Sequence, residues 1–368
     1  MYNTVNPFNW IHYRTVKYHH NGWSLTDASL SDNNEWLVYS SLNSTVSISA
    51  TDTAVRVPQR NISVVDSEAS QSRGVLSVRF TPGGRELIVG TMRGHMTVVD
   101  IATEAVVTDI RAHQRDLNCV AFADPDSPNL IYSGSDDSLI KLWDRRDLAA
   151  GKRPAGAMVG HREGIVFIKD KKDGVYVLSN SKDQSMKLWD IRMALSAKQF
   201  ADATTRLDAI NAPLRANPLD YRMADYDMSR WTRHPMDHSL VTFRGHSVLR
   251  TLVRCHFSPR SSSDNRYVYS ASADGKIYIW NLDATLAKVI DVKTAIKDRV
   301  KKPHEFDFAG WSMGLVADRH EMCVRDASWH PTAPIMVGKC RSNVVGERAH
   351  TFMCWCWVSL VSLFLVFV

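Results

Sequence analysis

Three segments of the chain share a pattern that ends in a tryptophan after a short apolar run. Each tryptophan has an aspartate six residues before it, and a serine four residues before that aspartate. A histidine preceded by glycine or alanine lies 28 to 34 residues upstream of the tryptophan. Such self-similarity constrains the fold strongly, because each repeat must form one supersecondary unit that stacks on its neighbours. The three segments end in Lys141–Arg146 (KLWDRR), Lys187–Arg192 (KLWDIR) and Tyr278–Asn281 (YIWN).

This spacing is typical of WD-repeat propeller blades, in which three short strands fit between the histidine and the tryptophan and a fourth strand follows. A buried indole needs a partner for its N–H, and a buried imidazole must satisfy two ring nitrogens. Serine, histidine and aspartate can complete one hydrogen-bonded chain, which makes the blade rigid when every member is satisfied. We therefore predict three structural tetrads: His113, Ser133, Asp137 and Trp143; His161, Ser179, Asp183 and Trp189; and His246, Ser270, Asp274 and Trp280.

Size, charge and cysteine content narrow the class of protein. The 368 residues suit one propeller, and the net charge of +6 permits a basic patch but is far below that of a nucleic-acid binder, so we expect no nucleic-acid partner. The six cysteines show no disulfide framework, and the N-terminus has no apolar signal core. These features favour a reducing compartment, and we expect the nucleus and cytoplasm.

The order of strand and turn patterns predicts an all-β fold of four-stranded blades, with about five full blades and part of a sixth. We divide the chain into an N-terminal segment (1–22), a propeller (23–337) and an atypical hydrophobic C-terminal tail (338–368). Two connections, about 194–238 and 291–319, are too long for simple linkers between blades. The first could carry a helix over Ala194–Ala209, and the second is basic.

The last 18 residues, TFMCWCWVSLVSLFLVFV, carry no charge and could just span a thin bilayer. Three interpretations stay open. The segment is an aberrant tail from alternative splicing or a wrong exon boundary, a C-terminal membrane anchor, or a distorted final strand pair that closes the ring. Cys354 and Cys356 alone are too few and too closely spaced to indicate a metal site.

Motifs for catalysis are missing from the sequence. It contains neither a phosphate-binding Gly-x-x-x-x-Gly-Lys run nor a Gly-x-Ser-x-Gly nucleophile turn. Serine, histidine and aspartate do converge in each tetrad, but they recur three times beside a tryptophan, which indicates a structural role. His19 and His20 form a lone pair in a polar segment, a weak signal for a metal. We expect no enzyme, no cofactor and no metal.

Residues between the blades extend the pattern to a specific family. The segments Asn21–Ser31, Lys182–Arg192, Gly245–Leu252 and Val324–Pro331 resemble the WD-repeat receptors called cullin-four-associated factor eleven, or WD-repeat protein twenty-three, and plant members most of all. The resemblance covers about residues 22–337. Members of this family have a seven-bladed ring, so by comparison this chain is truncated at both ends, with a first blade missing and the last incomplete.

The resemblance implies a substrate receptor of cullin-4 RING ubiquitin ligases. In that family the ligase adaptor, the larger damaged-DNA-binding protein subunit, docks on Trp-Asp-x-Arg boxes. An arginine that projects from a strand end carries five donors suited to carboxylates or carbonyls, although a single such arginine is usually just solvated. The third segment ends in Trp280-Asn281 and lacks the arginine. The residues implied in adaptor binding are Trp143, Asp144, Arg146, Trp189, Asp190 and Arg192.

We therefore expect a non-catalytic subunit that recruits a target protein for ubiquitination and proteasomal degradation, with the adaptor and cullin-4 as partners. The alternative is a general WD-repeat scaffold without ligase attachment, tethered to a membrane if the tail is a real anchor. The paired arginine boxes favour the first hypothesis. The sequence does not identify the target.

Overall fold

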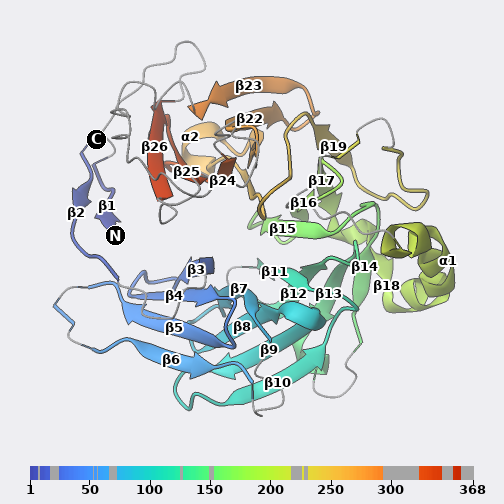
Figure 1. The fold of residues 1–368 in the computed structure, drawn as a ribbon, viewed down its shortest axis with the longest axis horizontal. Coiled ribbons are helices and arrows are strands. Elements are labelled where there is room, and N and C mark those ends of the chain that lie inside the picture. The colour runs from blue at the N-terminus through green and yellow to red at the C-terminus, as the bar shows by residue number, and fades with distance from the viewer. Residues whose placement is uncertain are drawn as a thin grey trace, which may run out of the picture. The chain divides into compact units, whose positions relative to one another are not determined.

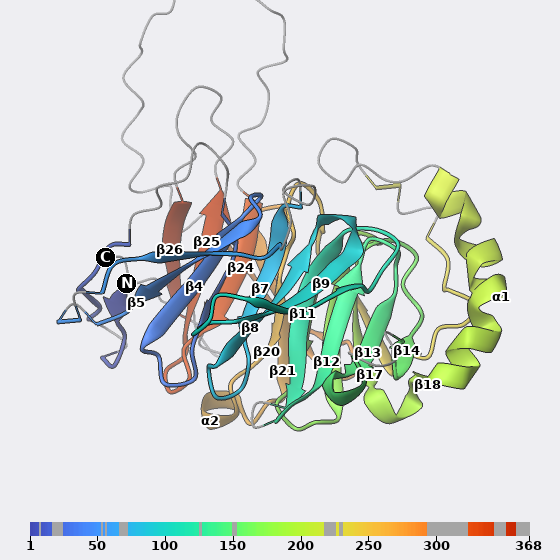
Figure 2. The ribbon, with the colours of Figure 1, turned by 90° about the horizontal axis from the view of Figure 1, so that it is seen from below.

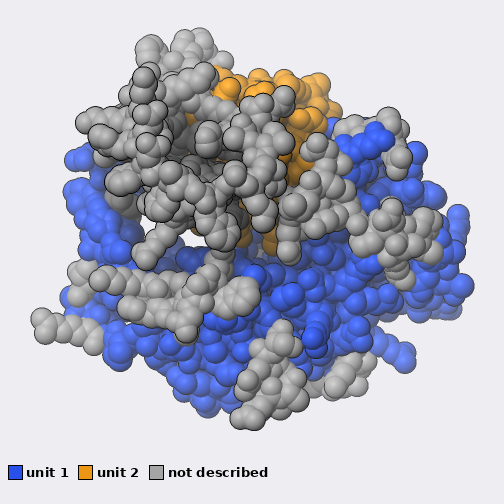
Figure 3. Space-filling model, viewed as in Figure 1, with its two compact units in different colours: residues 1–244 blue, residues 245–368 orange. Residues whose placement is uncertain are grey.

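The computed structural model describes residues 1–6, 9–16, 25–52, 54–55, 57–65, 73–124, 127–148, 153–216, 226–227, 231–292, 323–341 and 351–357. The chain forms two compact units, Met1–Arg244 and Gly245–Val368 (Figure 3). Within the described residues almost all regular structure is antiparallel strand, arranged in separate small sheets (Figure 1). This confirms the predicted all-β fold of propeller blades.

The first unit begins with the short hairpin β1 (Tyr2–Asn3) and β2 (Ile11–His12), followed by two regular four-stranded blades. Apolar residues recur along these strands, and tight turns separate them. In the second blade, Gly83 and Gly84 both have positive φ, which suits glycine in such a turn. The strands are β3 (Leu25–Leu30), β4 (Trp36–Ser41), β5 (Thr45–Ala50) and β6 (Arg60–Ser63), then β7 (Val75–Phe80), β8 (Glu86–Thr91), β9 (His95–Asp100) and β10 (Val106–Arg111).

The next two blades contain the Trp-Asp-x-Arg boxes. The connection to the outermost strand differs in length between the two blades. A short connection leads from β13 to β14, whereas a long insertion separates β17 from β19. The third blade has β11 (Leu117–Asp124), β12 (Ser127–Ser135), β13 (Ile140–Asp144) and β14 (Gly156–Met158), with β18 (Leu195–Ser196) on its edge. The fourth has β15 (Ile165–Asp170), β16 (Tyr176–Ser181), β17 (Ser185–Asp190) and β19 (Val241–Arg244).

The insertion carries the long helix α1 (Ala197–Ala216), which confirms the helix expected near Ala194–Ala209. Figure 2 shows α1 beside β14 and β18, which it contacts. Leu207 on α1 is 3% exposed and packs with Leu139 and Val159. Burial of this one apolar stripe holds a helix that otherwise has much polar surface.

The two boxes occupy equivalent places because the strand registers match. Trp143 pairs with Ile131 across β12 and β13, and Trp189 pairs with Val177 across β16 and β17. Both indole rings are 1% exposed. Side chains of neighbouring blades form continuous apolar clusters around these rings, as close-packed interiors require.

The second unit contains one four-stranded blade and one three-stranded sheet among its described residues. The blade is β20 (Cys255–Phe257), β21 (Tyr267–Ala271), β22 (Lys276–Asn281) and β23 (Leu286–Asp291), with the short helix α2 (Arg260–Ser263). The sheet is β24 (Cys323–Trp329), β25 (Ile335–Arg341) and β26 (Thr351–Trp357).

Strand structure continues past residue 337, the expected boundary between the propeller and the C-terminal tail. Strand β25 continues through Arg341, and all seven residues of β26 pair with it. Residues 351–357, the described part of the tail, are therefore strand. In the part of the chain that the structure describes, no helix is long and apolar enough to cross a membrane.

Several sequence predictions lie outside the described residues. These are the Asn21–Ser24 part of the family resemblance, the pair His19 and His20, most of the 291–319 connection, and the tail at 342–350 and 358–368.

Candidate functional site

The structure brings the first predicted tetrad together in the third blade. The indole N–H of Trp143 donates to Ser133 Oγ at 2.7 Å, and Ser133 Oγ lies 2.7 Å from His113 Nε2. His113 Nδ1 lies 2.9 Å from Asp137 Oδ2. One direction satisfies every group: the serine hydroxyl donates to Nε2, and the Nδ1 proton of a neutral imidazole is donated to the carboxylate. Burial lowers the pKa of His113, which agrees with a neutral ring.

The second tetrad repeats this geometry in the fourth blade. Trp189 Nε1 donates to Ser179 Oγ at 2.7 Å, and Ser179 Oγ lies 2.7 Å from His161 Nε2. His161 Nδ1 lies 2.9 Å from Asp183 Oδ2. The Asp183 carboxylate also accepts the backbone N–H of Arg162 and of Ser185. The Ser-His-Asp sets are therefore buried links between blade strands.

The third set is arranged differently around its aspartate. Asp274 accepts the hydroxyl of Tyr278 at 2.8 Å and the backbone N–H of Lys276 at 3.1 Å, and its side chain is 34% exposed. The Asp137 and Asp183 side chains are 2% and 1% exposed. His246 packs edge-on against Trp280, with ring centroids 5.3 Å apart. The tyrosine in place of the lysine of the other two segments thus provides Asp274, in the turn before β22, with a partner on that strand.

The buried aspartates make stability depend on pH. Burial alone would raise their pKa values, but the neighbouring imidazoles and hydrogen bonds outweigh it and lower the pKa of Asp137 and of Asp183 to about 2. The folded-state pKa therefore lies below the unfolded value, and the unfolded chain binds more protons in acid. We expect each to contribute about 2 kcal/mol of stability above pH 4, lost as the pH falls from about 4 to 2.

Denaturant unfolding measured from pH 7 down to pH 3 checks this expectation. The double variant Asp137→Asn, Asp183→Asn is the control, and its free energy of unfolding should fall less steeply over the same range. Equal slopes for the two proteins would contradict the assignment.

The first Trp-Asp-x-Arg box ends in a short turn that holds its arginine outward. Asp144 Oδ1 accepts the backbone N–H of Arg146 at 3.0 Å and its Nε–H at 2.9 Å, and Oδ2 accepts Nη2–H at 2.6 Å. These hydrogen bonds lower the pKa of Asp144 to about 2. The Arg146 side chain is nevertheless 73% exposed. Aspartate thus fixes one edge of a guanidinium that remains accessible.

The second box has the same construction. Asp190 accepts the backbone N–H and the Nε–H of Arg192, both at 2.9 Å, and Oδ2 accepts its Nη2–H at 2.6 Å. The Arg192 side chain is 68% exposed. In both boxes the tryptophan is buried, so Trp143 and Trp189 hold the strand end, while the accessible groups are Arg146 and Arg192.

Two other blades form the turn after their third strand without an arginine. Asp100 accepts the backbone N–H and hydroxyl of Thr103 at 2.7 and 2.9 Å. Asn281 donates from its side chain to Thr285 Oγ1 at 2.7 Å. An aspartate or asparagine at this turn is therefore a general turn device. The paired, outward arginine distinguishes the third and fourth blades.

Sequence reasoning missed a buried ion pair behind the second box. Lys187 Nζ lies 2.7 Å from Asp237 Oδ2, and each side chain is 1% exposed. Asp237 belongs to the long connection at about 194–238, for which the sequence predicts only a helix near its start. The one available signal was the lysine that precedes Leu-Trp in an apolar strand, where a charge requires a partner.

Described residues contain no group of three or more metal-ligating side chains placed to hold an ion.

Comparison with known proteins agrees with the repeat assignment. The family model described as "WD domain, G-beta repeat" matches residues 104–144, 152–190 and 238–281. A chain in the "Crystal Structure of Mitotic Checkpoint Complex" superposes with a TM-score of 0.59 and 13% identity, covering 97% of this chain and 88% of that one. At that identity the likeness concerns the fold alone.

Two groups of curated relatives match most of the chain. The LEC14B protein of Lithospermum erythrorhizon is 37% identical over 324 residues, which is 86% of this chain and 61% of the relative. A "DDB1- and CUL4-associated factor 11 homolog" of Caenorhabditis elegans is 31% identical over 318 residues, which is 84% of this chain and 49% of the relative. The chain thus spans about half to three fifths of the length of these relatives. It is a WD-repeat β-propeller protein, homologous over most of its length to the LEC14B proteins and the DDB1- and CUL4-associated factor 11 homologues.

Proposed function

We propose that the chain is a non-catalytic substrate receptor of a cullin-4 RING ubiquitin ligase, acting in the nucleus and cytoplasm. It docks the adaptor DDB1 through the two Trp-Asp-x-Arg boxes and recruits a target for proteasomal degradation, while the ligase does the chemistry. The observation that carries the proposal is the identical build of the two boxes on equivalent strands of consecutive blades. The name of the nematode relatives, DDB1- and CUL4-associated factor 11 homolog, supports the choice of partners.

The geometry suits a docking role because the arginines are accessible and already oriented. Each guanidinium is fixed along its Nε and Nη2 edge by the box aspartate, so little side-chain entropy is lost when a partner binds. Arginine is also enriched among the few interface residues, called hot spots, that contribute most of the binding free energy. Two such groups on adjacent blades give one partner two anchor points.

The double variant Arg146→Ala, Arg192→Ala tests the proposal. If each arginine contributes about 2 kcal/mol, affinity for DDB1 falls by about two to three orders of magnitude. Binding is measured with purified DDB1 by surface plasmon resonance, and circular dichroism checks that the fold is retained. Arg111→Gln, an exposed arginine at the opposite end of the strands, is the matched control and should bind normally. Full binding by the double variant would refute the proposal.

A further inference from the structure

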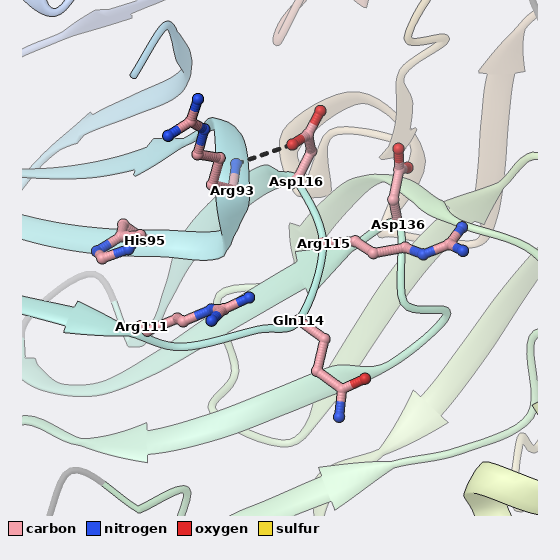
Figure 4. A pocket seen from close by; sticks show the side chains of 7 residues that line it. All are labelled: Arg93, His95, Arg111, Gln114, Arg115, Asp116 and Asp136. Carbon is pink, nitrogen blue, oxygen red and sulfur yellow. Dashed lines mark hydrogen bonds between the residues drawn. The ribbon is translucent and has the colours of Figure 1, made fainter. Parts of the chain in front are cut away.

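A basic pocket lies at the end of the blades opposite the boxes. It has a volume of about 510 Å³ and is lined by Arg93, His95, Arg111, Gln114, Arg115, Asp116 and Asp136. Figure 4 shows its arginines coming from three places: the turn between β8 and β9, the end of β10, and the connection to β11. Asp136 precedes strand β13 and Arg146 follows it. Because a five-residue strand is about 17 Å long, a ligand here leaves the box free.

Positive charge exceeds negative charge in this pocket. Its three arginines face two aspartates, and Asp136 is already paired with Lys182 Nζ at 2.6 Å. Four cationic groups therefore stand against two carboxylates. Burial raises the pKa of nearby Glu163 to about 7, so that carboxyl is about half neutral at physiological pH. Three arginines and Lys182 against Asp116, Asp136 and a half-charged Glu163 leave an excess of about one and a half positive charges. This excess suits a phosphomonoester, which carries about −1.5 to −2 at pH 7.

Arg93 replaces a structural residue of the neighbouring blades. The matching strand pairs Gly90–Met96, Gly134–Ile140 and Asn180–Met186 align the three turns. By this alignment Arg93 stands where the third and fourth blades have the tetrad residues Asp137 and Asp183.

Arg93 is exposed, and its φ of 63° is one that residues with a Cβ rarely adopt. With Gly94 at a φ of 78°, this is the geometry of a tight hairpin turn, which places Arg93 at the rim of the pocket.

The pocket is built on a rigid base. The backbone N–H of Arg93 donates to Asp116 Oδ1 at 2.8 Å (Figure 4). The N–H of His113 donates to the carbonyl of Gly94 at 3.0 Å, and Gln114 N–H donates to Asp137. A Cβ on Gly94 would lie 2.3 Å from the His113 carbonyl oxygen, so only glycine permits this approach. The first tetrad thus fixes the pocket wall before any ligand binds.

We propose that this pocket binds a phosphoserine or phosphothreonine side chain on a segment of a partner protein. Guanidinium groups recognise phosphate oxygens with paired, charge-assisted hydrogen bonds. That the partner is a degradation target rests on the proposed function, but the binding itself does not. The boxes and the pocket can be occupied together because they lie at opposite strand ends.

The test uses the full-length chain without DDB1. Immobilised protein is incubated with degenerate nonapeptide pools whose central residue is phosphoserine, serine or glutamate, and the retained peptide is quantified. A few charge-assisted hydrogen bonds correspond to about 10- to 100-fold in affinity, so we expect at least tenfold more phosphoserine than serine or glutamate peptide.

The variant Arg93→Gly, Arg111→Gln removes two of the pocket's guanidiniums and should reduce phosphoserine retention to the serine level. Glycine suits the positive φ at 93, so the fold is preserved. Arg85→Ala is the matched control, an exposed arginine in the turn at the other end of β8. Arg146→Ala, Arg192→Ala should also bind phosphopeptide normally, which separates this site from the adaptor site.

Three outcomes would overturn the proposal. Equal retention of the glutamate and phosphoserine pools would assign the pocket to acidic peptides. Retention that survives Arg93→Gly, Arg111→Gln would place the binding elsewhere. Preferential binding of phosphatidylinositol-4-phosphate vesicles over the peptide pool would assign the site to lipid.

Discussion

Replacing Asp237 with alanine is expected to destabilise the first unit by about 3–5 kcal/mol, because it leaves the ammonium group of Lys187 buried without its counterion. Lys187 Nζ lies 2.7 Å from Asp237 and donates to Thr242 Oγ1 at 2.8 Å. Both members of the ion pair are 1% exposed, so water cannot replace the lost carboxylate. Denaturant unfolding followed by tryptophan fluorescence measures the change.

A surface ion pair provides the control for this prediction. Arg60 and Glu104 lie 2.7 Å apart but are 34% and 46% exposed, so Glu104→Ala should cost about 1 kcal/mol or less. The double variant Lys187→Met, Asp237→Asn should recover part of the loss, since it removes the charge together with its partner. If Asp237→Ala cost no more than Glu104→Ala, the pair would not hold the insertion to β17.

The second large effect is expected for Asp183→Ala, at about 3–4 kcal/mol. Asp183 accepts from His161 Nδ1 at 2.9 Å, from the N–H of Arg162 at 2.9 Å and from the N–H of Ser185 at 3.0 Å. Alanine leaves these buried donors without an acceptor, and each unsatisfied donor costs about 1–3 kcal/mol of stability. Relaxation of the structure around the variant residue makes the total smaller than the sum. Denaturant unfolding gives the magnitude, and amide hydrogen exchange, read strand by strand, should show lost protection in β16 and β17 first.

Asp274→Ala is the matched comparison, because the same sequence position is 34% exposed in the second unit and water can replace the carboxylate. Its expected cost is about 1 kcal/mol. Similar losses for Asp183→Ala and Asp274→Ala would contradict a special role for the buried tetrad.

Local spacing was enough to predict how the two boxes lie in their blades, whereas their assignment to an adaptor came only from the family resemblance. Trp143 and Trp189 are buried in blade strands, and Arg146 and Arg192 project from the strand ends. These features follow from short-range pattern, because the three-residue step from tryptophan to arginine turns the chain out of the strand. The sequence did not reveal the hydrogen bonds from each arginine to the aspartate of its own box. These bonds orient the guanidinium group.

The exposure of Asp274 shows where a repeated pattern loses its predictive value. Its sequence position matches Asp137 and Asp183, yet Tyr278 stands where the other repeats have Lys141 and Lys187, and its hydroxyl binds the carboxylate. One side chain on the strand that follows the turn thus changes the partners of a residue that the spacing alone treats as equivalent.

The sequence by itself determined the repeats, the blade strands and the two boxes, since all of these depend on residues within about one blade of one another. Only the tertiary structure decided that Lys187 meets Asp237, that Arg93, Arg111 and Arg115 line one pocket, and that β26 pairs with β25. Those contacts join segments separated by turns, an insertion or a long connection. Their partners are selected by how whole sheets pack and by which charges that packing buries, and no local period in the chain records either.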